Sequence, residues 1–361
     1  MTSLFDPLTL RGATARNRVW LAPMCQYSVA SRDGVPTDWH LVHLGARATG
    51  GFGLVMTEAA AVAPEGRISP QDVGIWNDDQ ARAWERITAF VRSQGAVAAV
   101  QLAHAGRKAA TTEPWHGRTA VAERDGGWTP VAPSPLPYRD LTAPTGMTDA
   151  DIDDAVRSFA DAAARAVAAG FDVVEVHAAH GYLLHEFLSP LTNRRTDEYG
   201  GSFANRVRLL VRVVDAVRQS VPDRTPVLVR LSATDWVEGG WTPEETVELS
   251  AVLAGHGVDL FDLSSGGNDP RQQIPVQPGY QVPFAAAVRA KSGVPTAAVG
   301  LITEPRQAQR ILDDGSADAV LLGRAALRES AWPLRAAYEL RVPAPDAPYP
   351  VQYRQGEYRA G

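Results

Sequence analysis

Short apolar segments alternate along the chain with longer segments in which apolar residues recur at helical spacing. Eight short segments are rich in β-branched and aliphatic residues and too brief for helices, so each predicts a strand buried on both faces. These segments are 18–22, 54–57, 97–102, 173–177, 227–231, 260–263, 296–299 and 319–322.

Five of the longer segments predict helices. The first follows Thr148, a residue type that caps helix N-termini, and ends before Gly170, which suits a helix C-terminus. Three others begin near a proline, which is favoured in a first helical turn. The predicted helices are 149–169, 203–220, 243–255, 283–291 and 305–313.

Eight buried strands that alternate with helices indicate an α/β protein and favour a (β/α)8 TIM barrel over an open doubly wound sheet. The Gly-x-Gly-x-x-Gly turn of nucleotide-binding open sheets does not follow the first strand. We interpret 1–361 as a single domain. Two segments break the alternation: 104–147, predicted to be a capping insertion after strand three, and 342–361, a proline-rich irregular tail.

Composition narrows the class of protein. A formal charge of −6 argues against a nucleic-acid-binding protein. Cys25 is the only cysteine, which excludes an internal disulfide, a cysteine-ligated zinc site and a four-cysteine iron–sulfur cluster. The N-terminus has no signal-peptide pattern, and no apolar run reaches the ~18 residues of a membrane helix. We therefore expect a cytoplasmic protein without membrane or nucleic-acid partners.

Active sites of TIM barrels form at the carboxyl ends of the strands. The loops after strands seven and eight contain Gly300, Gly323 and Arg324. Such loops often bind phosphate, because glycines permit close backbone approach and an arginine holds phosphate oxygens in a bidentate fork. The alternative is that the two glycines only permit tight turns.

Two histidines follow strand four. His177 and His180 can point into one barrel mouth and donate hydrogen bonds to a single oxygen, as an oxyanion hole does, with Tyr182 beside them. The competing interpretation is a metal pair, but no His-Glu-x-x-His motif is present, and we predict no metal site.

Three further residues have both a functional and a structural interpretation. Arg230 lies within a strand and is either a cation facing an anionic cofactor ring or half of a structural ion pair. Gln101 can donate and accept at once, which suits an amide-like edge of a ligand. Cys25, taken alone, reads as an inert buried thiol.

Four segments carry a resemblance to a known family. They are APMCQYS (22–28), QLAHAGRK (101–108), HAAHGYLLHEFLSP (177–190) and NRRTDEYGGS (193–202). With them the chain resembles the old yellow enzymes, FMN-dependent ene-reductases, over nearly its whole length. Cys25, where other old yellow enzymes usually have threonine, makes it most similar to the thermophilic-like subgroup.

The resemblance implies an FMN-binding barrel and assigns roles to individual residues. Gln101 would pair with the pyrimidine edge of the flavin, and Arg230 would face N1 and O2. The phosphate would lie at Gly300, Gly323 and Arg324. The flavin ring would be lined by Pro23, Met24, Cys25 and Ala59.

The resemblance also implies a ping-pong reaction. NADPH or NADH reduces FMN, which passes hydride to the β-carbon of an activated α,β-unsaturated carbonyl or nitro compound. His177 and His180 would bind the substrate oxygen, Tyr182 would donate the proton, and Tyr27 would shape the substrate pocket. A homodimer or homotetramer is expected.

One position departs from the subgroup. A C-terminal arginine, two residues beyond a Gln-Tyr pair, often reaches the neighbouring active site in this subgroup. Here the pair is Gln352-Tyr353 and the position holds Gln355, with Arg354 and Arg359 nearby but out of place. The sequence therefore assigns no residue to the intersubunit arginine.

Other functions compete with this interpretation. A 2,4-dienoyl-CoA reductase type of barrel would need cysteines for an iron–sulfur cluster, which a single cysteine cannot supply. A non-redox phosphate-binding barrel, such as an isomerase or aldolase, is the main alternative. A catalytically inactive flavin-binding protein is a further one.

Overall fold

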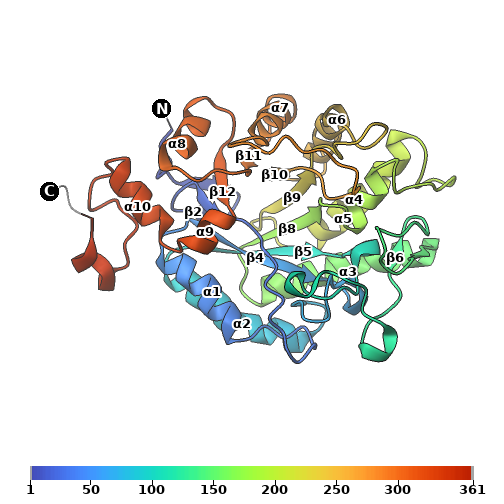
Figure 1. The fold of residues 1–361 in the computed structure, drawn as a ribbon. Coiled ribbons are helices and arrows are strands. Elements are labelled where there is room, and N and C mark those ends of the chain that lie inside the picture. Colours follow the sequence, from blue (N-terminus) through green and yellow to red (C-terminus); the bar gives the residue numbers. More distant parts are fainter. Residues whose placement is uncertain (1, 359–361) are drawn as a thin grey trace.

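The computed structural model describes residues 2–358, and in it eight parallel strands close into a barrel surrounded by helices (Figure 1). The predicted (β/α)8 barrel and all of its predicted strands are confirmed. In chain order the strands are β3 (Val19–Leu21), β4 (Leu54–Ala61), β5 (Val97–Ala103), β8 (Val173–Ala178), β9 (Val227–Ser232), β10 (Leu260–Ser264), β11 (Thr296–Ala298) and β12 (Ala319–Leu322).

The five predicted helices are also present, and the first is capped by Thr148, whose side chain accepts from the Asp151 N–H at 3.3 Å. Shorter helices follow β8 and β12: α4 (Leu183–Leu188), α9 (Arg324–Arg328) and α10 (Trp332–Glu339). The predicted five are α3 (Asp149–Ala168), α5 (Phe203–Ser220), α6 (Pro243–Ala254), α7 (Val282–Ser292) and α8 (Pro305–Asp313).

Two helices, α1 (Asp38–Thr49) and α2 (Asp78–Ser93), lie outside the sequence prediction. Helix α1 buries His40, His43 and Arg47, so its inward face carries no continuous apolar stripe. Asn77 is the N-cap of helix α2, since its side chain accepts from the Gln80 N–H at 2.9 Å, and this residue type is the signal from which the sequence could have predicted the helix. Figure 1 shows the two helices side by side along one face of the barrel.

Small elements complete the chain. A hairpin of β1 (Leu8–Leu10) and β2 (Ala13–Ala15) precedes the barrel. The 104–147 segment is mostly irregular, with only β6 (Val131–Ala132), β7 (Thr145–Gly146) and three short 3₁₀ turns. The described part of the tail contains one 3₁₀ turn, Val351–Gly356, beside α10, and Arg359 lies outside the described residues.

The barrel interior is layered, because alternate residues of a strand point to the same side. An apolar layer near the amino ends of the strands includes Val173, Leu228 and Leu260. Two residues farther along the same strands comes a buried charged layer, and two residues farther again comes a polar rim. The charged layer is Glu175, Arg230 and Asp262, and the rim is His177, Ser232 and Ser264.

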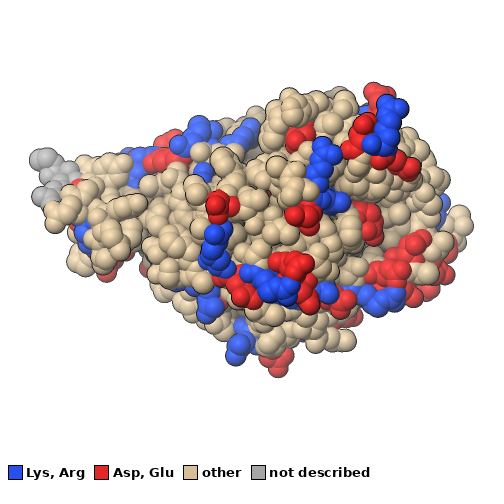
Figure 2. All heavy atoms as spheres, turned by 90° about the horizontal axis from the view of Figure 1, so that it is seen from below, with Lys and Arg blue, Asp and Glu red and all other residues tan. Residues whose placement is uncertain are grey.

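On the face shown in Figure 2, acidic and basic side chains are interspersed among uncharged residues. Among residues 2–358, no helix is both long and apolar enough to cross a membrane.

Candidate active site

A cavity of about 310 Å³, here called the inner pocket, opens where β4, β5 and β8 end. The structure brings together at this pocket nine of the residues singled out in the sequence. They are Pro23, Cys25, Tyr27, Ala59, Gln101, His177, His180, Tyr182 and Arg230. Met24 does not line it, and lies instead near Gly323, where an added Cβ would be 3.7 Å from the Met24 sulfur.

The charged layer lies beneath the inner pocket as its floor, and of this layer Arg230 lines the cavity. Arg230 Nε lies 3.0 Å from Asp262 Oδ2, and both residues are buried. Gln101 Nε2 donates to Glu175 Oε1 at 2.8 Å. Arg230 therefore forms the structural ion pair and also lines the pocket, and its role toward a cofactor ring stays a prediction.

Several buried polar atoms of the floor and rim are left without a hydrogen-bond partner among the described residues. They include Glu175 Oε2 in the floor and His177 Nδ1 in the rim, and Arg230 Nε has only its ion-pair contact with Asp262. Such atoms are costly to bury unpaired and are rare in folded proteins. A ligand with both donors and acceptors along a flat edge, such as an isoalloxazine ring, fits this donor and acceptor set.

Burial controls the protonation of the carboxylates in the floor. Burial, reinforced by Asp262, raises the pKa of Glu175, and Arg230 and Gln101 oppose that rise. Burial likewise raises the pKa of Asp262, against the lowering effect of Arg230. The floor therefore holds fewer negative charges than its count of carboxylates suggests.

The rim of the pocket carries the two histidines and a tyrosine. The ring centroids of His177 and His180 are 5.2 Å apart, and those of His177 and Tyr182 are also 5.2 Å apart. Burial, followed by the charge of Arg230, lowers the pKa of both imidazoles well below the usual value. Both rings are therefore neutral near pH 7, so each has one N–H donor and one acceptor nitrogen.

The turn that carries these residues is strained. His180 has φ = +60° and Gly181 has φ = +70°, a left-handed conformation that a non-glycine residue rarely adopts. A Cβ on Gly181 would lie 2.4 Å from the Gly267 carbonyl oxygen, so only glycine fits there. The surrounding structure must therefore hold the turn in place.

Side chains from three other segments hold this turn. The His180 N–H donates to Ser232 Oγ at 2.9 Å, and the Gly181 N–H donates to His185 Nδ1 at 2.9 Å. Lys108 Nζ donates to the His180 carbonyl at 2.7 Å. His185 Nε2 in turn lies 3.0 Å from Asp235 Oδ1, in a fully buried pair. This network fixes the position of the His180 ring.

The loop after β3 forms one wall of the pocket. Its Gln26 N–H donates to Glu58 Oε2 at 2.8 Å, and His40 Nε2 lies 3.1 Å from Glu58 Oε1. Burial, with the negative charges of Asp72 and Glu58, raises the pKa of the Cys25 thiol. Cys25 therefore presents a neutral sulfur to the pocket, and its contact with a flavin ring stays a prediction.

The residues of the predicted phosphate site line a second cavity of about 240 Å³. Gly300 has φ = +122°, and a Cβ there would lie 3.1 Å from Gln281 Nε2, so the loop needs a glycine. Gly323 directly precedes α9, and Arg324 and Arg328 of that helix line the cavity. Arg328, Thr303 and Tyr280 are residues of this cavity that the sequence did not single out.

The 104–147 segment contributes pocket residues that sequence reasoning missed. Pro114, Trp115 and Arg118 line the inner pocket, and the Trp115 ring meets the Tyr27 ring edge-on at 5.8 Å. The available signal was the length of the segment and its aromatic and proline content. That this segment caps the site stays a prediction.

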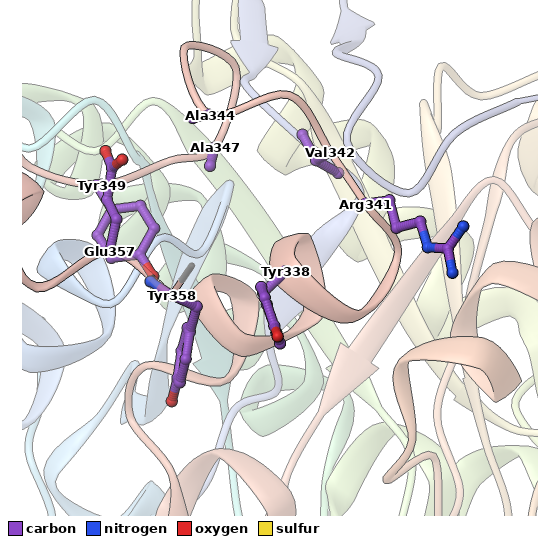
Figure 3. A pocket seen from close by; sticks show the side chains of 8 residues that line it. All are labelled: Tyr338, Arg341, Val342, Ala344, Ala347, Tyr349, Glu357 and Tyr358. Atoms are coloured by element: carbon purple, nitrogen blue, oxygen red, sulfur yellow. The ribbon is translucent and has the colours of Figure 1, made fainter. Parts of the chain in front are cut away.

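The tail forms a separate pocket around Tyr338, Tyr349 and Tyr358 (Figure 3). The Tyr338 and Tyr358 rings stack at 5.3 Å, and the Tyr358 N–H donates to Tyr349 Oη at 3.2 Å. Gln355 is exposed in the last 3₁₀ turn and does not line the inner pocket. The assembly state stays a prediction.

Comparison with known proteins identifies the family. Residues 3–342 match the NADH:flavin oxidoreductase / NADH oxidase family. The chain is 48% identical to the NADPH dehydrogenase of Geobacillus thermodenitrificans, over 98% of each chain. Morphinone reductase in complex with tetrahydroNAD has a similar fold, with a TM-score of 0.80 and 29% identity over 100% of both chains.

An old yellow enzyme homologue from Zymomonas mobilis is similar as well, with a TM-score of 0.78 and 28% identity over 99% of this chain and 100% of that chain. The family match and the 48% identity each extend over most of the sequence. The chain therefore belongs to the NADH:flavin oxidoreductase family that includes the old yellow enzymes, and it is an oxidoreductase with FMN as cofactor and NAD(P)H as reductant.

Proposed function

We propose that this oxidoreductase reduces activated alkenes, in which the double bond is conjugated to a carbonyl or nitro group. The observation that carries the proposal is the pair of neutral imidazoles, His177 and His180, which line one cavity beside the Tyr182 phenol. FMN supplies, when bound, the ability to accept and release a hydride equivalent.

The chain's own residues would hold the cofactor along the barrel mouth. Arg230 Nε contacts Asp262 Oδ2 at 3.0 Å, and within residues 2–358 its Nη groups make no hydrogen bond, so these would remain for the polar edge of the ring. Gln101 would bind the same edge. Gly300, Gly323 and Arg324 would hold the phosphate, and the ring would pack against Pro23, Met24, Cys25 and Ala59.

The histidines would bind the substrate oxygen. His180 Nε2 lies 2.7 Å from Ser264 Oγ. The Ser264 hydroxyl also lies 3.3 Å from Gln281 Oε1, an acceptor that Ser265 already occupies at 2.7 Å, and we infer that Ser264 donates over its shorter distance to His180 Nε2. In that tautomer His180 Nδ1–H and one N–H of His177 would donate to the substrate oxygen, where negative charge develops as the double bond is reduced.

Tyr182 would donate the proton to the α-carbon. Burial raises the pKa of its phenol, so the hydroxyl stays protonated near pH 7 and has a proton to donate. Tyr27 and Trp115 would shape the substrate side of the pocket, since their rings pack edge-on against each other.

An anaerobic titration of the FMN-loaded protein tests the proposal. NADPH is expected to bleach the flavin absorbance near ~450 nm, and cyclohexenone is then expected to restore it with one equivalent per flavin. Cyclohexanone, which lacks the double bond, serves as the control and is expected to restore nothing. If cyclohexenone leaves the flavin bleached while oxygen restores it, the alkene proposal is wrong.

The phosphate assignment predicts a binding defect. Arg324→Ala is expected to raise the Kd for FMN about 10- to 100-fold, because a charge-assisted contact worth ~1.5–3 kcal/mol is lost. Riboflavin, which lacks the phosphate, is expected to bind both proteins equally. Fluorescence titration of the apoprotein measures both ligands, and Arg310→Ala on α8 provides a charge-matched control. Equal FMN affinity in all three proteins would place the phosphate elsewhere.

A further inference from the structure

Asp235 follows β9, is fully buried and contacts several segments around the turn that carries His180. Its Oδ1 lies 3.0 Å from Nε2 of His185 on α4. Its Oδ2 accepts from Ser189 Oγ at 2.5 Å and from the Trp241 N–H at 2.9 Å. The pattern of the sequence assigns no role to Asp235 or His185, and neither residue lines the inner pocket.

The contacts of His185 define which of its ring nitrogens carries the proton. The Gly181 N–H donates to His185 Nδ1 at 2.9 Å, so Nδ1 is an acceptor and the ring proton is on Nε2, which faces Asp235. Burial raises the pKa of Asp235, but its contacts with His185 and the neighbouring donors outweigh burial and hold the pKa below its ordinary value. Asp235 is therefore ionised, and its carboxylate selects the tautomer of His185 that can accept from Gly181.

The same carboxylate also contacts a second neighbour of the turn. Gly181 packs against the 267–268 backbone, where an added Cβ would lie 2.4 Å from the Gly267 oxygen and 2.6 Å from the Asn268 Cα. Asn268 Nδ2 in turn donates to Asp235 Oδ2 at 3.3 Å. The turn thus lies against two groups, His185 and the 267–268 segment, that both contact Asp235.

His180 depends on this support because its backbone is strained. Its φ of +60° is one that a non-glycine residue adopts only where the surrounding contacts require it. Loss of the hydrogen bond at Gly181 would let the turn relax toward a commoner conformation. The imidazole of His180 would then leave its position, because it is attached at the strained residue.

We propose that Asp235 is a positioning residue for alkene reduction, which through His185 holds the His180 imidazole beside the substrate oxygen. This role rests on the proposed function, in which His180 donates to that oxygen. Asp235 touches neither substrate nor cofactor in this assignment, so its effect on the reaction is transmitted by His185 and the turn.

Asp235→Asn tests the role, because it changes the charge and the hydrogen bonding with almost no change in shape. Three donors point at Oδ2, so the amide oxygen of the variant is expected at that position. The amide NH₂ group then faces His185 Nε2, which must become an acceptor. The ring proton moves to Nδ1, where it meets the Gly181 N–H, and the hydrogen bond to the turn is lost.

Stopped-flow mixing of the reduced, FMN-loaded enzyme with cyclohexenone measures the consequence. The limiting rate of reoxidation is expected to fall about 10- to 100-fold in Asp235→Asn, the range typical of residues that orient a metal-binding histidine. In a His180→Ala background the same substitution is expected to change the rate by less than about twofold, because the ring that Asp235 positions is gone. Reoxidation by oxygen, which needs no bound enone, is expected to match wild type in Asp235→Asn.

The tautomer of His185 can be read from the ¹⁵N NMR spectrum of histidine-labelled enzyme. Wild type is expected to show a protonated Nε2 and an unprotonated Nδ1, and Asp235→Asn the reverse, with the signal assigned by its absence in His185→Gln. His185→Gln also tests rescue, because one amide can accept from the Gly181 N–H and donate to Asp235. It is expected to retain more of the reoxidation rate than His185→Leu, which can do neither.

Asp215→Asn is the matched control, because Asp215 also contacts a histidine, His256 at 2.7 Å, but near the surface, and it is expected to keep wild-type rates. Wild-type reoxidation in Asp235→Asn, an unchanged tautomer of His185, or an equal slowing with and without the His180 ring would overturn the proposed role. Failure of cyclohexenone to reoxidise wild type would instead contradict the proposed function, and the role of Asp235 with it.

Discussion

Reoxidation of the reduced enzyme by cyclohexenone is expected to slow about 10²- to 10³-fold in His177→Ala and in His180→Ala, the typical cost of one lost oxyanion-hole donor. Each neutral imidazole supplies one N–H to the substrate oxygen, and the charge on that oxygen grows as the double bond is reduced. The rings lie 5.2 Å apart, so a single oxygen can accept from both. Removing both is expected to cost less than the product of the single effects.

Anaerobic stopped flow separates this effect from others. Neither histidine is assigned to FMN, so both variants are expected to retain the cofactor. His256→Ala, on the surface beside Asp215, is the matched control and should behave as wild type. Wild-type reoxidation rates in both active-site variants would remove the oxyanion role from these residues.

Arg230→Leu is expected to lower the free energy of unfolding by about 3–5 kcal/mol, the cost of leaving one partner of a buried ion pair uncompensated. The variant leaves Asp262, which is fully buried, without its counter-charge. Urea unfolding of the apoprotein measures the effect without a contribution from cofactor binding. Arg230→Leu/Asp262→Leu is expected to recover most of the loss, because no unpaired charge remains.

The loss depends on pH in a defined direction. Burial already raises the pKa of Asp262 above its usual value, and losing Arg230 raises it further. The folded variant then binds a proton more tightly than the unfolded chain, so the free energy of unfolding falls as pH rises toward the folded pKa. Arg230→Leu should therefore lose more stability near about pH 8 than near about pH 5. A pH-independent loss would mean that Asp262 does not titrate in the folded variant.

The barrel could be predicted from sequence because its strands are short, apolar and buried on both faces. The charged layer inside the barrel could not be predicted in this way. Glu175 and Asp262 each lie within an otherwise apolar strand, but which strands are neighbours, and which residues share a level, follows from closure of the barrel. Only the register places Arg230 beside Asp262.

The site was predictable where residues lie in a strand or directly after one, and not where they come from the long 104–147 segment. His177, Gln101 and Arg230 occupy strand positions that the barrel brings to one pocket. Trp115 and Arg118 come from an irregular segment whose path follows from tertiary contacts. The supporting contacts of the His180 turn from Lys108 and Ser232 also join segments far apart in sequence.

The most direct test of the proposed chemistry follows the hydrogen atoms. Cyclohexenone is incubated with the FMN-loaded enzyme and [4-²H₂]NADPH in ordinary water, and the product is analysed by NMR and mass spectrometry. We expect cyclohexanone with deuterium at the β-carbon and a solvent-derived proton at the α-carbon. When unlabelled NADPH is used in D₂O, we expect the reverse labelling pattern at these two carbons. Cyclohexenol with deuterium on the carbinol carbon, or no labelled product at all, would contradict it.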